Sequence, residues 1–339
     1  MKRLWLFLGI LLLVLAIPVA LLFVYPNPNQ WQQVPAQPAA QPGQVTVTWL
    51  GTATLLISDG KTHLLTDGYF TRSSLDQILL SDLSSDPQRI QQGLKQAHID
   101  NLDAVMVLHS HFDHAMDSAR VAELTGARLL GSHSTAMTAK GAHLDDHRVT
   151  TVDVHKPYHF GDFTVTFVPA RHVPLPAPVE ALTGKGQIHQ PLEQPAPVGA
   201  WQEGHCYALV IQHPNGSLLI QGSAGDVAGA LDYYRADYAF VASASLGKQS
   251  EHYQKTFMDN TVNAVHARTV IPIHWDNFFA PLSANVKPLP LLLDNMDKSF
   301  RAITSHFQGD FQVLPPTHTM TLTPPAGPAP APPGSAPAR

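Results

Sequence analysis

Cysteine is almost absent from this 339-residue sequence, which contains a single one, Cys206. One thiol cannot form an internal disulfide, so a small scaffold held together by disulfide bonds is excluded. Charged residues are also scarce, at 14%, and the formal net charge is -5. Because no basic excess is present to attract phosphate groups, the composition does not predict a nucleic-acid partner. A repeat architecture is not indicated either, since no segment recurs at a fixed period.

The N-terminus carries a long apolar run. Lys2 and Arg3 precede an uncharged stretch, residues 4–25, which as a helix would span roughly 33 Å, enough to cross a bilayer. A cleaved signal peptide has a shorter apolar region, about 7–15 residues, and a small-residue cleavage site that is not evident here. We therefore expect residues 1–25 to be a transmembrane signal anchor that places the domain outside the cytoplasm, in the periplasm or at the cell surface. A removed secretory signal is the alternative, and it leads to the same side of the membrane.

Composition divides the remaining chain into three parts. Residues 26–44 are rich in proline and glutamine and predict an extended linker. Residues 324–339 are rich in proline and alanine, cannot bury apolar side chains and predict a disordered tail. The folded domain is therefore expected at residues 45–323.

Within residues 45–323, strand and helix patterns alternate. Two predicted hairpins and several β–α units favour two sheets between helices, which is an α/β fold of the αββα four-layer sandwich type. The predicted strands lie within residues 44–58, 61–67, 102–108, 127–132, 163–170, 206–222, 238–243 and 269–274. Predicted helices begin near Ala115 and cover residues 251–267 and 291–306.

The hexapeptide HSHFDH, residues 109–114, follows a short apolar strand pattern. Loops between a strand end and a helix are where α/β proteins place ligands. One histidine is usually an ordinary core or surface residue, but four ligand-type side chains in six residues indicate nitrogen and oxygen ligands for zinc or a similar divalent ion. The hexapeptide therefore predicts a metal site.

The order H-x-H-x-D-H resembles the signature of the metallo-β-lactamase superfamily. The segments WLGTATLLI (49–57) and LLTDGYF (64–70) resemble the opening of the branch that contains N-acylphosphatidylethanolamine phospholipase D and ascorbate-6-phosphate lactonase. VPARH, ending at His172, and VIPIHWDNF, containing His274, resemble two later motifs of that branch. The resemblance covers nearly all of residues 45–323.

This resemblance implies a set of roles for individual residues. His109, His111 and His172 would hold one metal ion, and Asp113, His114 and His274 a second one. Zn²⁺ is the expected metal, as one or two ions, with Mn²⁺ or Fe²⁺ as alternatives. Asp67 would lie beside the ions, where it orients a ligand histidine or the bound water.

The chain departs from the family pattern at the bridging position. The family places an aspartate there, after a strand, whereas this chain has the strand SLLIQ followed by GSAGD. Counting from the Asn215–Gly216 turn favours Ser223, whose hydroxyl is a poor ligand beside a carboxylate. If the loop instead turns Asp226 inward, a bridged two-metal site is retained.

The expected reaction is hydrolysis by a metal-bound hydroxide, with Asp113 helping to hold and orient the water. The branch includes a phosphodiesterase that acts on lipid and a sugar-phosphate lactonase. The expected membrane anchor favours a lipid or an envelope-derived molecule, so a phosphodiester, small or lipidic, is the expected substrate. A lactonase or esterase of the same fold is the alternative activity. A tethered binding protein with a degenerate metal site is the alternative from another class, and the serine at position 223 supports it. The oligomeric state is open.

A proline-rich loop, residues 174–205, closely follows His172. It is either a cover of the cavity that selects the substrate or an ordinary surface loop. Trp201 and His205 are its candidates for substrate contact. Cys206 begins an apolar strand, which predicts a buried, inert thiol.

Overall fold

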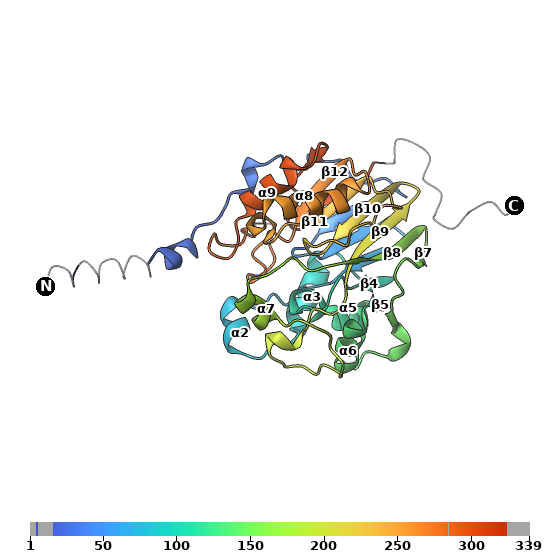
Figure 1. The fold of residues 1–339 in the computed structure, drawn as a ribbon. Helices are drawn as coiled ribbons and strands as arrows, with labels where there is room; N and C mark the ends of the chain where they lie inside the picture. Colours follow the sequence, from blue (N-terminus) through green and yellow to red (C-terminus); the bar gives the residue numbers. More distant parts are fainter. Residues whose placement is uncertain (1–4, 6–15, 284, 324–339) are drawn as a thin grey trace.

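The computed structural model describes residue 5 and residues 16–283 and 285–323. Within these residues, two seven-stranded sheets lie face to face and helices cover the outer face of each sheet (Figure 1). This arrangement of two mixed sheets with helices agrees with the predicted αββα sandwich.

The first sheet, in the order β14-β1-β2-β3-β4-β5-β6, combines the two ends of the domain. Its pairs are antiparallel from β14 to β3 and parallel from β3 to β6. The bounds are β14 Thr319–Thr321, β1 Thr46–Trp49, β2 Leu55–Ser58, β3 His63–Thr66, β4 Ala104–Met106, β5 Arg128–Gly131 and β6 Val149–Thr151.

The second sheet, in the order β13-β12-β11-β10-β9-β8-β7, repeats this pattern of pairing. Its pairs are antiparallel from β7 to β10 and parallel from β10 to β13. The bounds are β13 Asp310–Phe311, β12 Thr269–Ile273, β11 Tyr238–Ala242, β10 Gly216–Gln221, β9 Cys206–His213, β8 Phe163–Ala170 and β7 Pro157–Phe160. Parallel strands of both sheets end at loops that carry ligand-type residues described below, and one further such residue, His172, follows the antiparallel strand β8.

Three apolar layers hold the sandwich together. The central layer contains alternate residues of both sheets, such as Val47 and Leu209, because successive side chains of a strand point to opposite faces. The outer face of the second sheet packs against Phe257 of α8 and Ile303 of α9. The outer face of the first sheet packs against α3, α5 and α6. The helices are α2 Leu75–Leu80, α3 Pro87–Gln96, α4 Phe112–Ala115, α5 Ser118–Thr125, α6 His133–Gly141, α7 Ala177–Thr183, α8 Glu251–Met258 and α9 Met296–Ser305.

The predicted helix at residues 251–267 is α-helical only to Met258 and continues as a π-helix, Asp259–Asn263. The late helix begins at Met296 instead of residue 291, because Asn295 caps it by accepting a hydrogen bond from the Lys298 N–H, at 3.1 Å. Several short elements were not predicted, among them β6, β13 and β14. Strands of two or three residues are too short to show a period-two pattern.

The N-terminal segment lies at one side of the molecule (Figure 1). Residues 16–21 are helical, but among the described residues no helix has the length and apolarity needed to cross a membrane. Half of the predicted span, residues 4–25, and the whole predicted tail, residues 324–339, lie outside the described residues.

The first part of the predicted linker is not extended away from the domain. Val34 N–H donates to the Val313 carbonyl at 2.8 Å, and the Trp31 ring packs edge-on against Phe300 and Phe311. An aromatic side chain that covers apolar residues of the core stabilises this docking. The segment that was expected to act as a spacer is therefore part of the folded surface at residues 31–34.

Candidate metal centre

Five strand ends supply the candidate site. Asp67 follows β3, the hexapeptide follows β4, His172 follows β8, Ser223 follows β10 and His274 follows β12. In the hexapeptide, His111 is the N-cap residue of α4, so the chain turns from strand to helix inside the motif. Every ligand-type residue of the motif is buried, as is His274, whereas His172 is partly exposed.

The first group contains His109, His111 and His172. One ligand atom from each of the three lies within 4.8 Å of the other two. Nε2 of His109 and Nδ1 of His111 are 3.2 Å apart, and the ring centroids of His111 and His172 are separated by 4.7 Å. Residues 109 and 172 come from different sheets, so only the folded chain brings this group together.

The second group contains Asp113, His114 and His274, again with ligand atoms within 4.8 Å of one another. His274 Nε2 lies 3.3 Å from Asp113 Oδ2 and 3.3 Å from His114 Nε2. The two groups are neighbours, because the ring centroids of His109 and His114 are only 3.8 Å apart. The structure thus places all six predicted ligands around one centre, while their binding of metal stays a prediction.

The position of His274 depends on the opening strand of the domain. His274 N–H donates to the Thr52 carbonyl at 3.0 Å, and the Thr52 N–H donates to Asp276 Oδ1 at 2.8 Å. Asp276 also forms a fully buried ion pair with Arg72. These contacts explain why the WLGTAT segment and the HWDNF segment belong to the same site.

Asp67 lies behind His114. Its Oδ2 is 2.7 Å from His114 Nδ1, and its Oδ1 accepts a hydrogen bond from the Leu108 N–H at 2.8 Å. Of the two roles expected for Asp67, the structure favours the orientation of a ligand histidine over direct contact with water. Asp67 is therefore a positioning residue in this structure, not a catalytic one in the sense of touching the reacting atoms.

The hydrogen bonds of three histidines fit a cation. His114 Nδ1 faces Asp67, His172 Nδ1 lies 2.8 Å from the Val173 carbonyl, and His111 Nε2 lies 3.1 Å from the Gly184 carbonyl. Carbonyl and carboxylate oxygens only accept, so each of these nitrogens carries the proton and the other nitrogen of the ring keeps its lone pair. Such bonds to the second nitrogen are typical of metal-binding histidines. The donor set, five imidazoles and one carboxylate, suits zinc or a similar divalent ion.

Burial and mutual repulsion keep the first group neutral. Burial, followed by the neighbouring histidines, lowers the pKa of His109 well below its usual value. Burial is also the largest cause that lowers the pKa of His111 to about 4 and of His172 to about 3. Neutral imidazole is the form that binds metal, so these side chains are prepared for binding.

The second group is polarised by its carboxylates. Burial opposes charge on both His114 and Asp113, but the attraction between His114 and the carboxylates of Asp67 and Asp113 raises the pKa of His114. The neighbouring imidazoles hold the pKa of Asp113 well below its usual range, against the effect of burial. Asp113 is therefore a carboxylate and a hard anionic ligand.

Ser223 contacts the residue next to His172, whereas Asp226 contacts Asn260. The Ser223 hydroxyl accepts a hydrogen bond at 3.0 Å from the N–H of Val173, which is adjacent to His172. Asp226 is partly exposed, and its Oδ2 accepts a hydrogen bond from Asn260 at 2.6 Å. The loop register expected from the Asn215–Gly216 turn agrees with this placement, and Asp226 is not brought to the six ligands.

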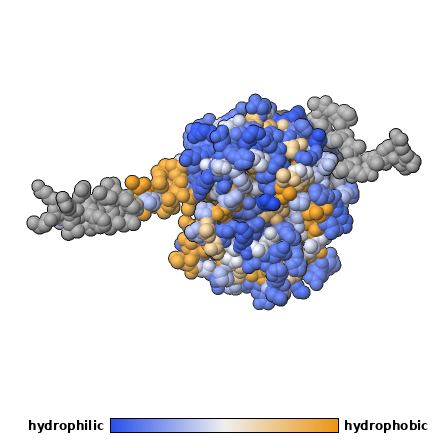
Figure 2. Space-filling model, viewed as in Figure 1, coloured by the Kyte–Doolittle hydropathy of each residue, from blue (hydrophilic) through white to orange (hydrophobic). Residues whose placement is uncertain are grey.

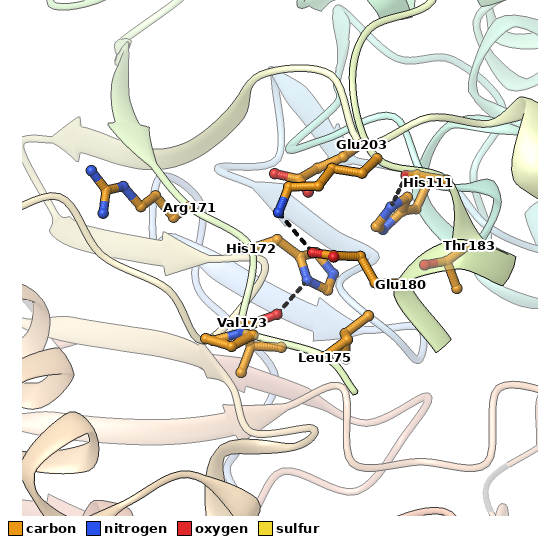
Figure 3. A pocket seen from close by; sticks show the side chains of 11 residues that line it. His111, Arg171, His172, Val173, Leu175, Glu180, Thr183 and Glu203 are labelled. Carbon is orange, nitrogen blue, oxygen red and sulfur yellow. Dashed lines mark hydrogen bonds and ion pairs between the residues drawn. The ribbon is translucent and has the colours of Figure 1, made fainter. Parts of the chain in front are cut away.

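A cavity of about 400 Å³ opens beside the first group, and the loop that follows His172 forms much of its wall (Figure 3). The sequence indicated this loop but not the charged side chains that line the cavity, because they follow no spacing pattern. The lining includes His111, His172, Arg171, Glu180, Lys185 and Glu203.

Gly184 fixes part of this wall. Its φ of +84° lies in the left-handed region, and a Cβ at this position would meet the Gly199 carbonyl at 2.5 Å. The resulting turn directs the Gly184 carbonyl toward His111.

The two substrate contacts expected from the loop differ in outcome. Trp201 is fully buried in an apolar cluster with Tyr69 and Phe112, so the expectation that it contacts substrate is wrong. Its size and apolar ring are used to hold the loop on the domain. His205 is exposed and lies 3.1 Å from Gln187, outside the cavity lining. The Cys206 thiol is buried, as expected.

Asp59, Asp162 and His213 form a third group of ligand-type residues, away from the centre. Nδ1 of His213 accepts a hydrogen bond from the Asn215 N–H at 3.1 Å. A neutral ring then carries its proton on Nε2, which leaves no lone pair for a metal. The group is better explained as a buried contact between two turns.

Comparison with known proteins agrees with this geometry. The family model described as beta-lactamase superfamily domain matches residues 46–274. A UPF0173 metal-dependent hydrolase from Anaeromyxobacter sp. (strain K) is 30% identical over 141 residues, which are 40% of this chain and 46% of that protein. The chain therefore spans less than half the length of the first curated relatives that it matches. A UPF0173 metal-dependent hydrolase from Heliobacterium modesticaldum is 23% identical over 287 residues, 81% of this chain and 97% of that protein.

Solved structures show the same fold. The metallo-beta-lactamase fold protein YhfI from Bacillus subtilis has a TM-score of 0.50 at 14% identity, over 82% of this chain and 99% of that one. An isothiocyanate hydrolase from Delia radicum gut bacteria has a TM-score of 0.50 at 12% identity, with 82% and 99% covered. At such low identity these likenesses concern the fold alone, and the narrower branch expected from the sequence motifs stays a prediction.

Proposed function

Because this chain belongs to the beta-lactamase superfamily, whose domain model spans residues 46–274, we propose that it is a metal-dependent hydrolase that cleaves a phosphodiester. The observation that carries this proposal is the convergence of six ligand-type side chains, in two adjacent groups of three, at the ends of strands from both sheets. A pair of divalent ions, when bound, would supply an acidified water molecule and polarise the scissile bond.

The residues around the centre have distinct roles. Asp113, a carboxylate held beside His274, accepts a hydrogen bond from water and orients it. Asp67 holds His114 in one orientation through the 2.7 Å contact to Nδ1. The loop of residues 174–205 covers one side of the cavity and limits the access of solvent.

Two cationic side chains of the cavity support an anionic substrate, although Glu180 and Glu203 also line it. Arg171 and Lys185 line it, and Lys185 Nζ lies 2.8 Å from Glu180 Oε1 at its mouth (Figure 3). A phosphodiester carries one negative charge that a guanidinium or an ammonium group attracts. A neutral lactone lacks a charge for this attraction, so the two cations favour a phosphodiester over it, but not over the lactone of a sugar phosphate.

Apolar surface near the cavity supports a lipidic or envelope-derived substrate. Leu79 and Leu80 of α2 are 53% and 83% exposed, and Val179 and Leu182 of α7, the helix that lines the cavity, are also exposed. Figure 2 shows apolar residues on the side of the molecule where α2 and the N-terminal segment lie. Exposed apolar groups of this kind bind lipid or protein surfaces. The N-terminal membrane anchor and the extracytoplasmic location remain predictions from the sequence.

Purified full-length protein loaded with Zn²⁺, Mn²⁺ or Fe²⁺ tests the proposal. We expect hydrolysis of bis(p-nitrophenyl) phosphate and of a phospholipid in mixed micelles, and little hydrolysis of a lactone. His172→Ala should lower kcat/KM by at least about 100-fold. His159→Ala, which changes an exposed histidine on β7, is the matched control and should keep the wild-type rate. Bound metal without turnover of any diester, ester or lactone would favour the tethered binding protein, and turnover of lactones alone would favour the lactonase.

Metal counting on the same preparations tests the bridging position. Ser223→Asp would add a carboxylate beside the centre, next to the Val173 amide. We expect the content to rise from one tightly held ion to two in elemental analysis after gel filtration. An unchanged content of two ions in both proteins would show that the six ligands hold a pair without a bridge.

A further inference from the structure

Glu203 lines the cavity beside the first group, and no step described above uses it. The residue lies just before β9, at the end of the loop that covers the cavity. Figure 3 shows its side chain among those of the cavity, above His172 and beside His111.

Backbone hydrogen bonds tie Glu203 to the metal-binding hexapeptide. Its carbonyl accepts from the Ser110 N–H at 2.8 Å, and Ser110 separates His109 from His111. Its N–H donates to the Gly184 carbonyl at 3.1 Å, the same oxygen that lies 3.1 Å from His111 Nε2. Glu203 is therefore held at a constant position relative to the first group, as a group that acts on substrate must be.

The Glu203 carboxyl group is surrounded by a thiol and by charged groups of both signs. The Cys206 thiol lies 3.6 Å from its Oε1, the charges of Lys185 and Glu180 act on it, and Arg171 lines the same cavity. Burial is the largest influence and raises the pKa of Glu203, and the charge of Glu180 acts in the same direction. The hydrogen bond from Cys206 and the charge of Lys185 oppose this rise without cancelling it.

The other carboxyl groups in or near the cavity are less suited than Glu203 to give a proton to a substrate. Glu180 is paired with Lys185, and the pKa of Asp113 is held well below its usual range by neighbouring imidazoles. Asp67 is fully buried behind His114 and does not line the cavity. Among the described residues that line the cavity, Glu203 is thus the carboxyl group whose pKa burial raises.

We propose that Glu203 is a general acid, which protonates the leaving-group oxygen of the substrate. This inference rests on the proposed hydrolytic function. The oxygen of water forms a bond to phosphorus while the bond from phosphorus to the leaving oxygen breaks, and the electron pair of that bond stays on the leaving oxygen. That oxygen takes the proton of the Glu203 carboxyl group and departs as an alcohol. The attacking water keeps one hydrogen on the new phosphorus–oxygen bond and gives its other proton to solvent. The Glu203 carboxylate then recovers a proton from solvent before the next turnover.

Two diesters that differ in their leaving group test the proposal on the full-length, metal-loaded protein. A p-nitrophenolate leaves without protonation, whereas an alkoxide needs a proton. Glu203→Gln should lower kcat/KM for an alkyl diester, such as glycerophosphocholine, by about 100-fold or more, and that for bis(p-nitrophenyl) phosphate by less than about threefold. The wild-type rate on the alkyl diester should fall at high pH as Glu203 ionises, and this limb should be absent in Glu203→Gln. Glu180→Gln should retain the limb, whatever its effect on KM.

Three measurements that do not depend on turnover accompany these rates. The metal content of Glu203→Gln should equal that of wild type, and its thermal unfolding should be within a few degrees. The infrared difference spectrum of wild type near neutral pH should contain a protonated carboxyl band that Glu203→Gln lacks.

Four outcomes would overturn the inference. An equal loss on both diesters, or a loss of bound metal in Glu203→Gln, would make Glu203 a positioning residue. The absence of the carboxyl band would show that it stores no proton. If wild type hydrolyses neither diester while binding metal, the proposed function itself fails, and the role of Glu203 fails with it.

Discussion

Asp67 has a backbone φ of +54° and uses both of its carboxylate oxygens, one toward Leu108 N–H and one toward His114 Nδ1. A non-glycine residue in this conformation is strained and is retained where the surroundings need its side chain in one place. The main effect of burial is to raise the pKa of Asp67, and the positive charge that His114 carries when protonated opposes it. The pair therefore shares a proton that stays on the imidazole side, since the pKa of His114 is raised.

Asp67→Asn should weaken the second metal group without unfolding the domain. The amide oxygen still accepts from Leu108 N–H, but the amide N–H₂ faces the Nδ1–H of His114, and the two donors repel. We expect the affinity of the weaker site for Zn²⁺ to fall by about 10–100-fold in a competition titration with a chelating dye. Asp153→Asn, at an exposed aspartate paired with Lys156, is the control. Equal affinities in the two variants would contradict the role assigned to Asp67.

At the scale of the element, the segment around Trp31 joins the N-terminus to the second sheet. The Trp31 ring packs 5.3 Å from Phe300 of α9 and 5.5 Å from Phe311 of β13, centroid to centroid, and its Nε1 donates to Asp297 Oδ1 at 2.9 Å. Gln30 Nε2 donates to the same oxygen at 2.6 Å. The two side chains share one polar partner but only Trp31 covers apolar surface.

Trp31→Ala should lower the free energy of unfolding by about 2–3 kcal/mol, which is below the cost for a fully buried tryptophan because this one is partly exposed. Gln30→Ala removes a hydrogen bond to Asp297 without uncovering Phe300 and should change the free energy by about 0.5 kcal/mol or less. Urea unfolding followed by circular dichroism measures both. Equal stability of the two variants would show that residues 26–34 are a spacer after all.

Elements differ in how far the sequence predicts them. Residues 163–170 were predicted as a strand and form β8 over the same residues, because the alternation of apolar and polar side chains is long enough to read. The β9–β10 hairpin was predicted from its Pro214–Asn215–Gly216 turn and is confirmed. The π-helix after Met258 and the two-residue strand β13 could not be predicted, since their backbone follows from packing against neighbours rather than from local preference.

The residues of the site also differ in how far the sequence predicts them. The hexapeptide is local, so its four ligand-type residues could be identified from spacing alone. Glu203 and Lys185, which line the cavity, could not be identified in this way, because their sequence neighbours do not distinguish them from other charged residues of a loop. The prediction for Trp201 was wrong for a related reason. A large apolar ring can contact substrate or fill a hydrophobic core, and only its burial in the folded chain decides between the two.

At the scale of the whole molecule, the buried histidines couple folding to pH. His111 and His172 have a pKa of about 4 and about 3 in the folded chain, against about 6.5 in an unfolded chain. Between these values the unfolded chain binds more protons than the folded one, so the free energy of unfolding falls as the pH is lowered below about 6.5. His114, whose pKa is raised, acts in the opposite direction and loses its contribution as the pH rises through its folded pKa.

The metal-free protein should therefore be less stable at pH 5 than at pH 6.5, by about 2 kcal/mol for each of His111 and His172. Denaturant unfolding in the presence of a chelator measures this slope. His172→Ala should reduce the slope, whereas His159→Ala, which changes an exposed histidine outside the metal centre, should not. A stability that is flat over this range would mean that the two imidazoles are not neutral in the folded chain.

The sequence by itself determined the local features: the apolar N-terminal run, the alternation of strands and helices, and the four ligand-type residues of the hexapeptide. Each of these is a matter of side-chain type and spacing over a few neighbouring residues. Only the tertiary structure decided which distant residues meet, namely that His172 and His274 face the hexapeptide, that Ser223 and not Asp226 contacts the residue next to His172, and that Glu203 lines the cavity. Such contacts depend on the register of two sheets and on loop conformation, which arise from packing over the whole domain.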